Sequence, residues 1–244
     1  MRIILLNVEY DGTGYVGWQS QSNGIAVQDV VESALTQILK QKVRIHSSGR
    51  TDAGVHARSM AAHFRTDSNI PLQAFREGAN RFLPPDVVIR DVREMPENFH
   101  ARYSAKGKWY RYTIYNNEMR SPLAARTAWH LRGGLDLDLM RPAAESIVGT
   151  YDFQAFRSSG CVAKTSIRAI FQVEVVADRE FVYIDIKGSG FLRNMVRILV
   201  GTLVEVGQGK RSASDLQKLL QGEKGVMCGP TAPAHGLCLQ EVWY

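Results

Sequence analysis

Residues 43–64 read "VRIHSSGRTDAGVHARSMAAHF", and this stretch decides how the first half of the chain folds. Its two ends, "VRIH" and "MAAHF", carry the apolar and β-branched residues typical of strands. The segment between them is polar and contains two glycines, which favours a loop. We therefore expect a strand, a charged loop and a second strand.

The rest of the first half supplies the elements around this stretch. Residues 3–10 and 87–94 predict two further strands. Two helices are predicted as well, because apolar side chains recur at helical spacing. The order strand–helix–strand–strand–helix–strand is that of a ferredoxin-like unit. The apolar side chains are Val27, Val30, Val31, Ala34, Leu35 and Ile38 for the first helix, and Leu72, Phe75, Ala79 and Phe82 for the second.

The second half repeats roughly the same order, with one extra helix. In "KWYRYTIYN", Tyr110, Tyr112 and Ile114 alternate with more polar neighbours, as in a strand with one buried face. The predicted elements are a strand at 108–116, a helix near 138–148, a hairpin at 169–176 and 180–186, a helix at 191–206 and a strand at 236–244. The extra helix is a short one after 191–206, where Ser212 and Asp215 have the spacing of a capping box.

The two halves together predict an α+β fold. We expect two ferredoxin-like halves that form a broad, mostly antiparallel sheet, with helices on one face and a central cleft. Pro96, Asn98 and Gly107 interrupt the pattern between the halves. The expected domains are therefore residues 1–103, which carry the Asp52 loop, and residues 104–244.

The composition is typical of a soluble globular protein, with 45% hydrophobic and 22% charged residues in 244. No apolar run approaches the length of a membrane span, and no secretory signal is visible. Three cysteines without CxxC spacing fit free thiols in a reducing cytoplasm; Cys228, His235 and Cys238 give only a weak metal signal. Lysine and arginine number 30 against 24 acidic residues, a net charge of +6 that favours a polyanionic partner.

Gly12, Gly14 and Gly17 follow the first strand with the spacing of a dinucleotide-binding loop. In that motif the glycines open a helix whose N-terminus holds the pyrophosphate, whereas residues 19–26 here separate the loop from the next helix. We therefore expect no nucleotide cofactor. Tyr15 and Trp18 in this loop either contact nucleic-acid bases or pack onto the domain.

Three further positions have both an ordinary and a functional interpretation. Asp52 either carries chemistry or forms a local turn or helix cap. Tyr110 either belongs to the core or offers its ring to a ligand. Arg193 and Arg197 lie one turn apart on a mostly apolar predicted helix, where they are either solvated at its edge or partly buried and facing an anion.

Five sequence blocks, in this order, resemble the TruA family of tRNA pseudouridine synthases. They run through nearly the whole chain, from Glu9 to Tyr244, and the nonapeptide at 49–57 is highly specific. The blocks are "YDGTGYVGWQSQ" at 10–21, "GRTDAGVHA" at 49–57, "KWYRYTIYN" at 108–116, "FLRNMVR" at 191–197 and "APAHGLCLQEVWY" at 232–244.

The resemblance implies an isomerase without a cofactor or metal. Such an enzyme detaches uracil from ribose C1′ in a tRNA anticodon arm, turns the base and rejoins it through C5. The family's target uridines are those at tRNA positions 38, 39 and 40. By the same resemblance, Asp52 is the essential carboxylate, Tyr110 stacks on the target base and Arg197 pairs with Asp52. A homodimer is expected, partly from the family and partly because one chain offers limited surface to a tRNA.

These residue types suit that chemistry. Breaking a glycosidic bond builds positive charge on the sugar, which a carboxylate beside C1′ stabilises, and a nearby arginine keeps that carboxylate ionised. An aromatic stack worth ~1–3 kcal/mol offsets much of the cost of removing a base from a stem. Arg50 and Arg58 flank Asp52 and either hold phosphates or are ordinary surface arginines. The alternative function is RNA binding without catalysis.

Overall fold

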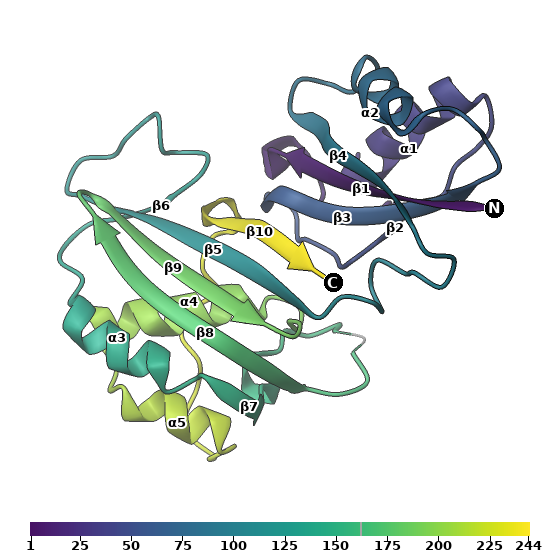
Figure 1. The fold of residues 1–244 in the computed structure, drawn as a ribbon. Coiled ribbons are helices and arrows are strands. Elements are labelled where there is room, and N and C mark those ends of the chain that lie inside the picture. The colour runs from purple at the N-terminus through teal and green to yellow at the C-terminus, as the bar shows by residue number, and fades with distance from the viewer. Residues whose placement is uncertain (162) are drawn as a thin grey trace. The chain divides into compact units, whose positions relative to one another are not determined.

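The computed structural model describes residues 1–161 and 163–244, which divide into two units (Figure 1). Met1–Lys106 and Cys238–Tyr244 form the first unit, and Gly107–Leu237 form the second. Each unit combines helices with a mostly antiparallel sheet, so the predicted α+β class is confirmed. The predicted cleft between the halves stays a prediction.

The first unit is organised around β1 (Arg2–Tyr10), which lies between two antiparallel neighbours. These are β3 (His56–Thr66) and β4 (Val87–Met95). The short β2 (His46–Ser47) pairs antiparallel with β3. With two helices in between, these strands follow the predicted ferredoxin-like order.

The C-terminal strand belongs with the first unit. In β10 (Leu237–Trp243), Cys238 and Leu239 pair in parallel with His56 and Ala57 of β3. The sequence placed residues 236–244 with the second half. That assignment followed the order of elements along the chain, which does not reveal a pairing between such distant segments.

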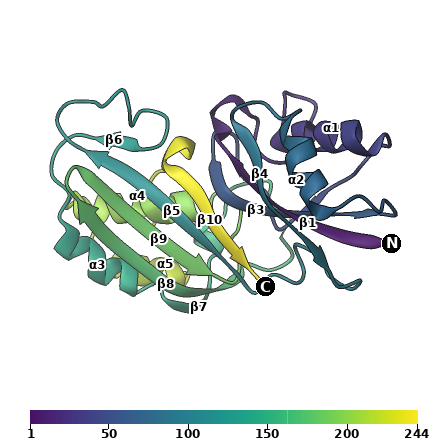
Figure 2. The ribbon, with the colours of Figure 1, turned by 45° about the horizontal axis from the view of Figure 1, so that its top comes forward.

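Helices α1 (Val27–Leu39) and α2 (Leu72–Asn80) lie on one face of the first unit's sheet (Figure 2). α1 buries Val27, Val31, Ala34 and Leu35, and α2 buries Phe75 and Ala79, which confirms most of the predicted apolar faces. Phe82 is an exception, because α2 has already ended and this ring is 54% exposed. Asn80, the last residue of α2, ties the helix to β4, because its side-chain amide hydrogen bonds both the N–H and the C=O of Ile89, at 2.8 and 2.9 Å.

The strand predicted from "VRIH" is much shorter than expected, since β2 begins only at His46. The reason lies in α1. The N–H of Ile45 donates to the Glu32 carboxylate at 2.9 Å, and its C=O accepts a long hydrogen bond of 3.4 Å from the Gln28 amide. Helix side chains therefore satisfy the backbone that a strand neighbour would otherwise bind.

The second unit is organised around β5 (Gly107–Asn116) and β9 (Phe181–Gly188), which pair antiparallel. β8 (Ile167–Asp178) forms the predicted hairpin with β9, and β7 (Gly149–Asp152) pairs with β8. β6 (Trp129–Leu131) runs parallel to the end of β5. Three helices complete the unit: α3 (Leu137–Glu145), α4 (Met195–Gly207) and α5 (Ser214–Leu220).

Helix α4 is almost entirely buried and begins four residues later than the predicted Phe191. Asn194, just before it, has a left-handed backbone with φ of 62°, which a right-handed helix cannot include. Residues 229–232 lie across the helix. The N–H of Gly229 donates to the Thr202 hydroxyl at 3.0 Å, and a Cβ added to Gly201 would lie 1.7 Å from the carbonyl oxygen of Pro230.

None of the helices in the described residues is both long enough and apolar enough to cross a membrane.

Three histidines meet at one edge of the first unit. His63 is 3% exposed, and its ring centroid lies 5.4 Å from that of His46 and 4.6 Å from that of His100. The N–H of Ala101 donates to Nδ1 of His63 at 3.2 Å. Burial, followed by the nearby His100, lowers the pKa of His63 to about 4.

We predict that Gly201→Ala destabilises the protein. Alanine is the better helix former by about 1 kcal/mol, but its methyl group has no room beside Pro230, and overpacking costs about 1–3 kcal/mol. Urea unfolding measures the change. Gly134→Ala is the matched control, because a Cβ there meets nothing within 4 Å. A Gly201→Ala protein as stable as the control would contradict the packing described.

A second prediction concerns acid stability. An unfolded histidine takes up a proton near pH 6.5, whereas folded His63 does so only near 4, so the free energy of unfolding should fall as the pH drops through this window. This site contributes on the order of 3 kcal/mol at most. His63→Asn should reduce that slope, as measured by urea unfolding at pH 7.5 and 5. An unchanged slope would show that His63 is not the group responsible.

Candidate functional site

The loop that carries Asp52 is held by three buried residues. Ser48, Thr51 and Val55 are 1%, 8% and 1% exposed. The N–H of Ser48 donates to the carbonyl of Ala61 at 2.8 Å, and the Thr51 hydroxyl lies 2.8 Å from the hydroxyl of Tyr10. Every third or fourth residue therefore fixes the loop, and the side chain of Asp52 stays half-buried between two of these anchors.

Asp52 opens a tight turn. The N–H of Val55 donates to the carbonyl of Asp52 at 3.1 Å, which closes a four-residue turn. Gly54, the third residue of this turn, has φ of 79°, a conformation that type II turns require and that glycine adopts at least cost. The predicted local turn at Asp52 is therefore present, and it fixes the backbone at the residue that carries the carboxylate.

The glycine-rich loop before α1 packs against the backbone of this turn. A Cβ on Gly12 would lie 2.0 Å from the carbonyl oxygen of Val55, and one on Gly17 would lie 2.5 Å from that of Thr51. The N–H of Trp18 donates to the same Thr51 carbonyl at 3.2 Å. The spacing that imitates a dinucleotide-binding loop thus has a different cause, which is close approach between two backbones.

Tyr15 and Trp18 are packed into the first unit. Trp18 is 1% exposed and its ring lies 5.9 Å from that of Tyr10. Tyr15 is 9% exposed, and its hydroxyl donates to Asp86 at 2.7 Å. Burial and this hydrogen bond raise the pKa of Tyr15. The packing interpretation of these rings is confirmed.

Arg50 and Arg58 are both exposed and lie on either side of the turn, the first in the loop and the second in β3. Neither forms an ion pair within the described residues. The first unit therefore presents one carboxylate from a rigid turn, with two exposed guanidinium groups close to it in the chain.

Tyr110 lies on the buried face of β5 in the second unit. Its backbone pairs with Ile186 of β9, and its ring is 8% exposed and in T-shaped contact with Phe191 at 5.3 Å. On the other face of the strand, Arg111 forms a bidentate ion pair with Asp185 at 2.8 and 2.9 Å. Contacts on both faces therefore fix the strand. Tyr110 lies in a core environment, which was one of the two interpretations of this residue.

Arg197 is half-buried on α4, and two neutral oxygens are among the acceptors of its guanidinium. Nε donates to the carbonyl of Ala232 at 2.7 Å, and one terminal nitrogen donates to Oδ1 of Asn194 at 3.0 Å. The N–H of Ala232 in turn donates to the carbonyl of Arg197 at 3.1 Å. These acceptors help to orient the guanidinium and offset part of the cost of burying it.

The residues after Ala232 are tied to the same strand as Tyr110. The hydroxyl of Tyr112 donates to the carbonyl of Pro233 at 2.8 Å, and a Cβ on Gly236 would lie 2.6 Å from the Tyr112 ring. Burial raises the pKa of Tyr112, so this phenol remains a donor. The sequence did not single out Asn194 or Ala232, although both lie inside blocks that carried the resemblance.

Arg193 differs from its neighbour. It precedes α4 instead of lying one turn before Arg197 within the helix, and its side chain is exposed. The interpretation of Arg193 as a solvated arginine is therefore the better one. Among the described residues, no group of three or more His, Cys, Asp or Glu side chains is placed to hold a metal ion.

Asp52, Arg50 and Arg58 thus belong to the first unit, and Tyr110 and Arg197 belong to the second. The pairing of Asp52 with Arg197 joins residues of different units and stays a prediction.

Comparison with known proteins identifies the family. The family model described as tRNA pseudouridine synthase matches residues 7–104 and 143–244. A tRNA pseudouridine synthase A from Syntrophotalea carbinolica is 57% identical over 244 residues, covering 100% of this chain and 97% of that protein. The protein of the same name from Geobacter sp. strain M21 is 53% identical, covering 100% and 99%, and that from Acetivibrio thermocellus is 48% identical, covering 100% of both.

Similarity to solved structures is remote. The archaeal box H/ACA sRNP Nop10-Cbf5 complex contains a chain that is 12% identical, with a TM-score of 0.39 over 96% of this chain and 46% of that one. A similarity of this size supports no conclusion. The sequence relatives and the family match do, and this chain belongs to the TruA family of tRNA pseudouridine synthases.

Proposed function

We propose that this protein isomerises uridine to pseudouridine in the anticodon arm of tRNA, at positions 38, 39 and 40. Membership in the tRNA pseudouridine synthase family supports the reaction and the substrate class. The observation that carries the proposal is a half-buried carboxylate, Asp52, presented by a turn that buried residues and close backbone packing hold in place.

Asp52 is the catalytic carboxylate in this proposal. Cleavage of the bond between uracil and C1′ leaves positive charge on the ribose, and an anionic oxygen stabilises that charge directly or forms a bond to the sugar. Either route needs the carboxylate in a defined place, because small displacements of a reacting group cost large factors in rate. The turn from Asp52 to Val55 supplies such a fixed place.

Arg197 keeps the Asp52 carboxylate ionised in the proposed site. A guanidinium remains protonated under all ordinary conditions and presents several donors in one plane. Its bonds to Ala232 and Asn194 hold this plane in a set direction. The proposed role therefore depends on the backbone of residues 229–232 as well as on α4.

Tyr110 receives the target base. A base that leaves a stem loses stacking worth a few kcal/mol, and an aromatic ring returns ~1–3 kcal/mol of it. The T-shaped contact with Phe191 orients the Tyr110 ring before any RNA binds. Preorganisation of this kind lowers the entropy lost on binding.

Arg50 and Arg58 hold phosphates on either side of the Asp52 turn, since both are exposed. A tRNA substrate is consistent with the net charge of +6. We further propose that the protein acts as a homodimer in the cytoplasm, where a second copy widens the surface available to a tRNA.

We predict that Asp52→Asn abolishes turnover and leaves tRNA binding nearly intact. The amide has almost the same shape but no charge, so kcat should fall at least about a thousandfold, as for other essential catalytic groups. Pseudouridine is mapped after incubation with an unmodified tRNA transcript, and binding is measured by filter retention. A non-catalytic RNA-binding protein would form no pseudouridine even as wild type.

We predict that Tyr110→Leu lowers kcat/KM by about 5- to 160-fold, which corresponds to a lost stack of ~1–3 kcal/mol. Tyr110→Phe is the matched control, because it keeps the ring and should keep most of the activity. Circular dichroism checks that both variants are folded. Equal losses in the two variants would point to the hydroxyl and contradict the stacking role.

A further inference from the structure

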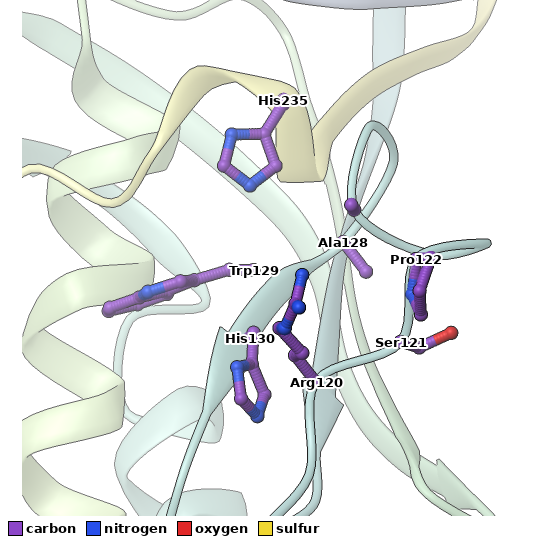
Figure 3. Close-up of a pocket in the computed structure, with 8 residues that line it drawn as sticks. Arg120, Ser121, Pro122, Ala128, Trp129, His130 and His235 are labelled. Atoms are coloured by element: carbon purple, nitrogen blue, oxygen red, sulfur yellow. The ribbon is translucent and has the colours of Figure 1, made fainter.

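A second candidate site lies in a hollow of the second unit, lined by residues other than Tyr110 and Arg197. Its volume is about 290 Å³, at the small end of ligand sites. The loop after β5, strand β6 and the turn before β10 form its wall, and Figure 3 shows Arg120, His130 and His235 gathered around it. The lining residues are Arg120, Ser121, Pro122, Ala125, Ala128, Trp129, His130 and His235.

The loop that forms one wall is ordered by its own hydrogen bonds. The N–H groups of Thr127 and Ala128 donate to the carbonyl of Ala124 at 3.0 and 2.9 Å. Nε2 of His130 donates to the carbonyl of Asn117 at 2.8 Å, and the N–H of Asn117 donates to the carbonyl of Leu131 at 3.2 Å. Both ends of the loop are thereby fixed to β6, so the hollow is a built feature of the unit.

The charge of this hollow is of one sign. Arg120 is exposed and makes none of the ion pairs in the described residues, and none of the eight lining residues is acidic. His130 and His235 lie beside it. A cationic site attracts a phosphate and a carboxylate-rich surface alike. Charge alone therefore leaves the class of anion open.

The apolar part of the lining indicates which class of anion fits the pocket. Pro122, Ala125 and Ala128 contribute apolar groups to the lining, and the Trp129 ring lies on the other side of Arg120 (Figure 3). A nucleotide has this combination of a planar apolar base and a charged phosphate, and aromatic rings beside arginine are the usual partners of single-stranded RNA. The chain's substrate class supplies such a ligand.

We propose that this pocket, here named the Arg120 pocket, binds one nucleotide of the tRNA outside the reacting position, with Arg120 on the phosphate. The proposal rests on the proposed function for its ligand, but it concerns binding and not catalysis. The pocket is thus an accessory contact that adds affinity and leaves the chemical step unchanged.

The test compares charge at one position of the pocket rim. Ala125 is exposed and lines the hollow, so Ala125→Glu and Ala125→Lys introduce side chains of similar length and opposite charge. With an unmodified tRNA transcript, Ala125→Glu should raise Kd and KM about tenfold or more, whereas Ala125→Lys should keep or lower them. In both variants kcat should stay within about twofold of wild type.

Arg120→Ala completes the experiment. It should weaken tRNA binding about tenfold, as expected for a lost charged hydrogen bond, and reduce the slope of log K against log salt by about 0.7–0.9. Arg132→Ala, which removes an exposed arginine that does not line the pocket, should change Kd less than about twofold.

Similar losses for Ala125→Glu and Ala125→Lys, or unchanged tRNA binding by Arg120→Ala, would overturn the proposal. If Arg120→Ala bound tRNA as wild type does but bound an acidic peptide more weakly, the pocket would belong to a protein partner instead. Failure of the proposed function has a different signature. In that case wild type makes no pseudouridine, while the effects of Arg120 and Ala125 on tRNA affinity can still be observed.

Discussion

The close approach of two backbones, the loop at residues 11–18 and the turn at residues 51–55, is the constraint on which the candidate site depends. Gly12 and Gly17 have no Cβ, and no other residue leaves room for the carbonyl oxygens of Val55 and Thr51. The buried hydroxyl pair of Tyr10 and Thr51 adds a polar contact beneath the turn. A carboxylate on such a support has little freedom to move, which is what a reacting group requires.

In the second unit, too, glycines allow two backbones to lie in close contact next to a charged side chain. Gly201 and Gly229 allow residues 229–232 to lie directly on α4, and this segment supplies the carbonyl that orients Arg197. In both units, therefore, a glycine contact between two backbones stands behind a charged side chain. Precision at these side chains comes from main-chain packing, which is stiffer than contacts between flexible side chains.

Much of the fold followed from the sequence because local patterns determine it. The alternation in residues 108–116 and the helical spacing from Val27 to Leu35 depend on neighbours only a few positions away. The start of α4 could not be predicted from the sequence, because the left-handed conformation of Asn194 does not alter the periodicity of apolar residues. Parallel pairing of β10 with β3 depends on contacts that no local window contains.

The sequence likewise predicted only some features of the candidate site. A charged residue between two glycines drew attention to Asp52, but nothing in the letters indicates that the carbonyl of Ala232 receives Arg197, since every residue has a carbonyl. The sequence argued against a cofactor loop at the glycines before α1, but only the structure shows that close backbone packing accounts for them. Aromatic residues in that loop could be read as surface or core until their burial was known.

The place of β10 has a consequence for biosynthesis. Cys238 pairs with His56 across 182 positions of sequence (238 minus 56), and the Tyr244 hydroxyl donates to the carbonyl of Ala101 at 2.9 Å. The ribosome must therefore release residues 238–244 before the N-terminal sheet can close along β3. Until then that strand presents unpaired amide groups at an open edge, where nascent chains are most prone to associate wrongly.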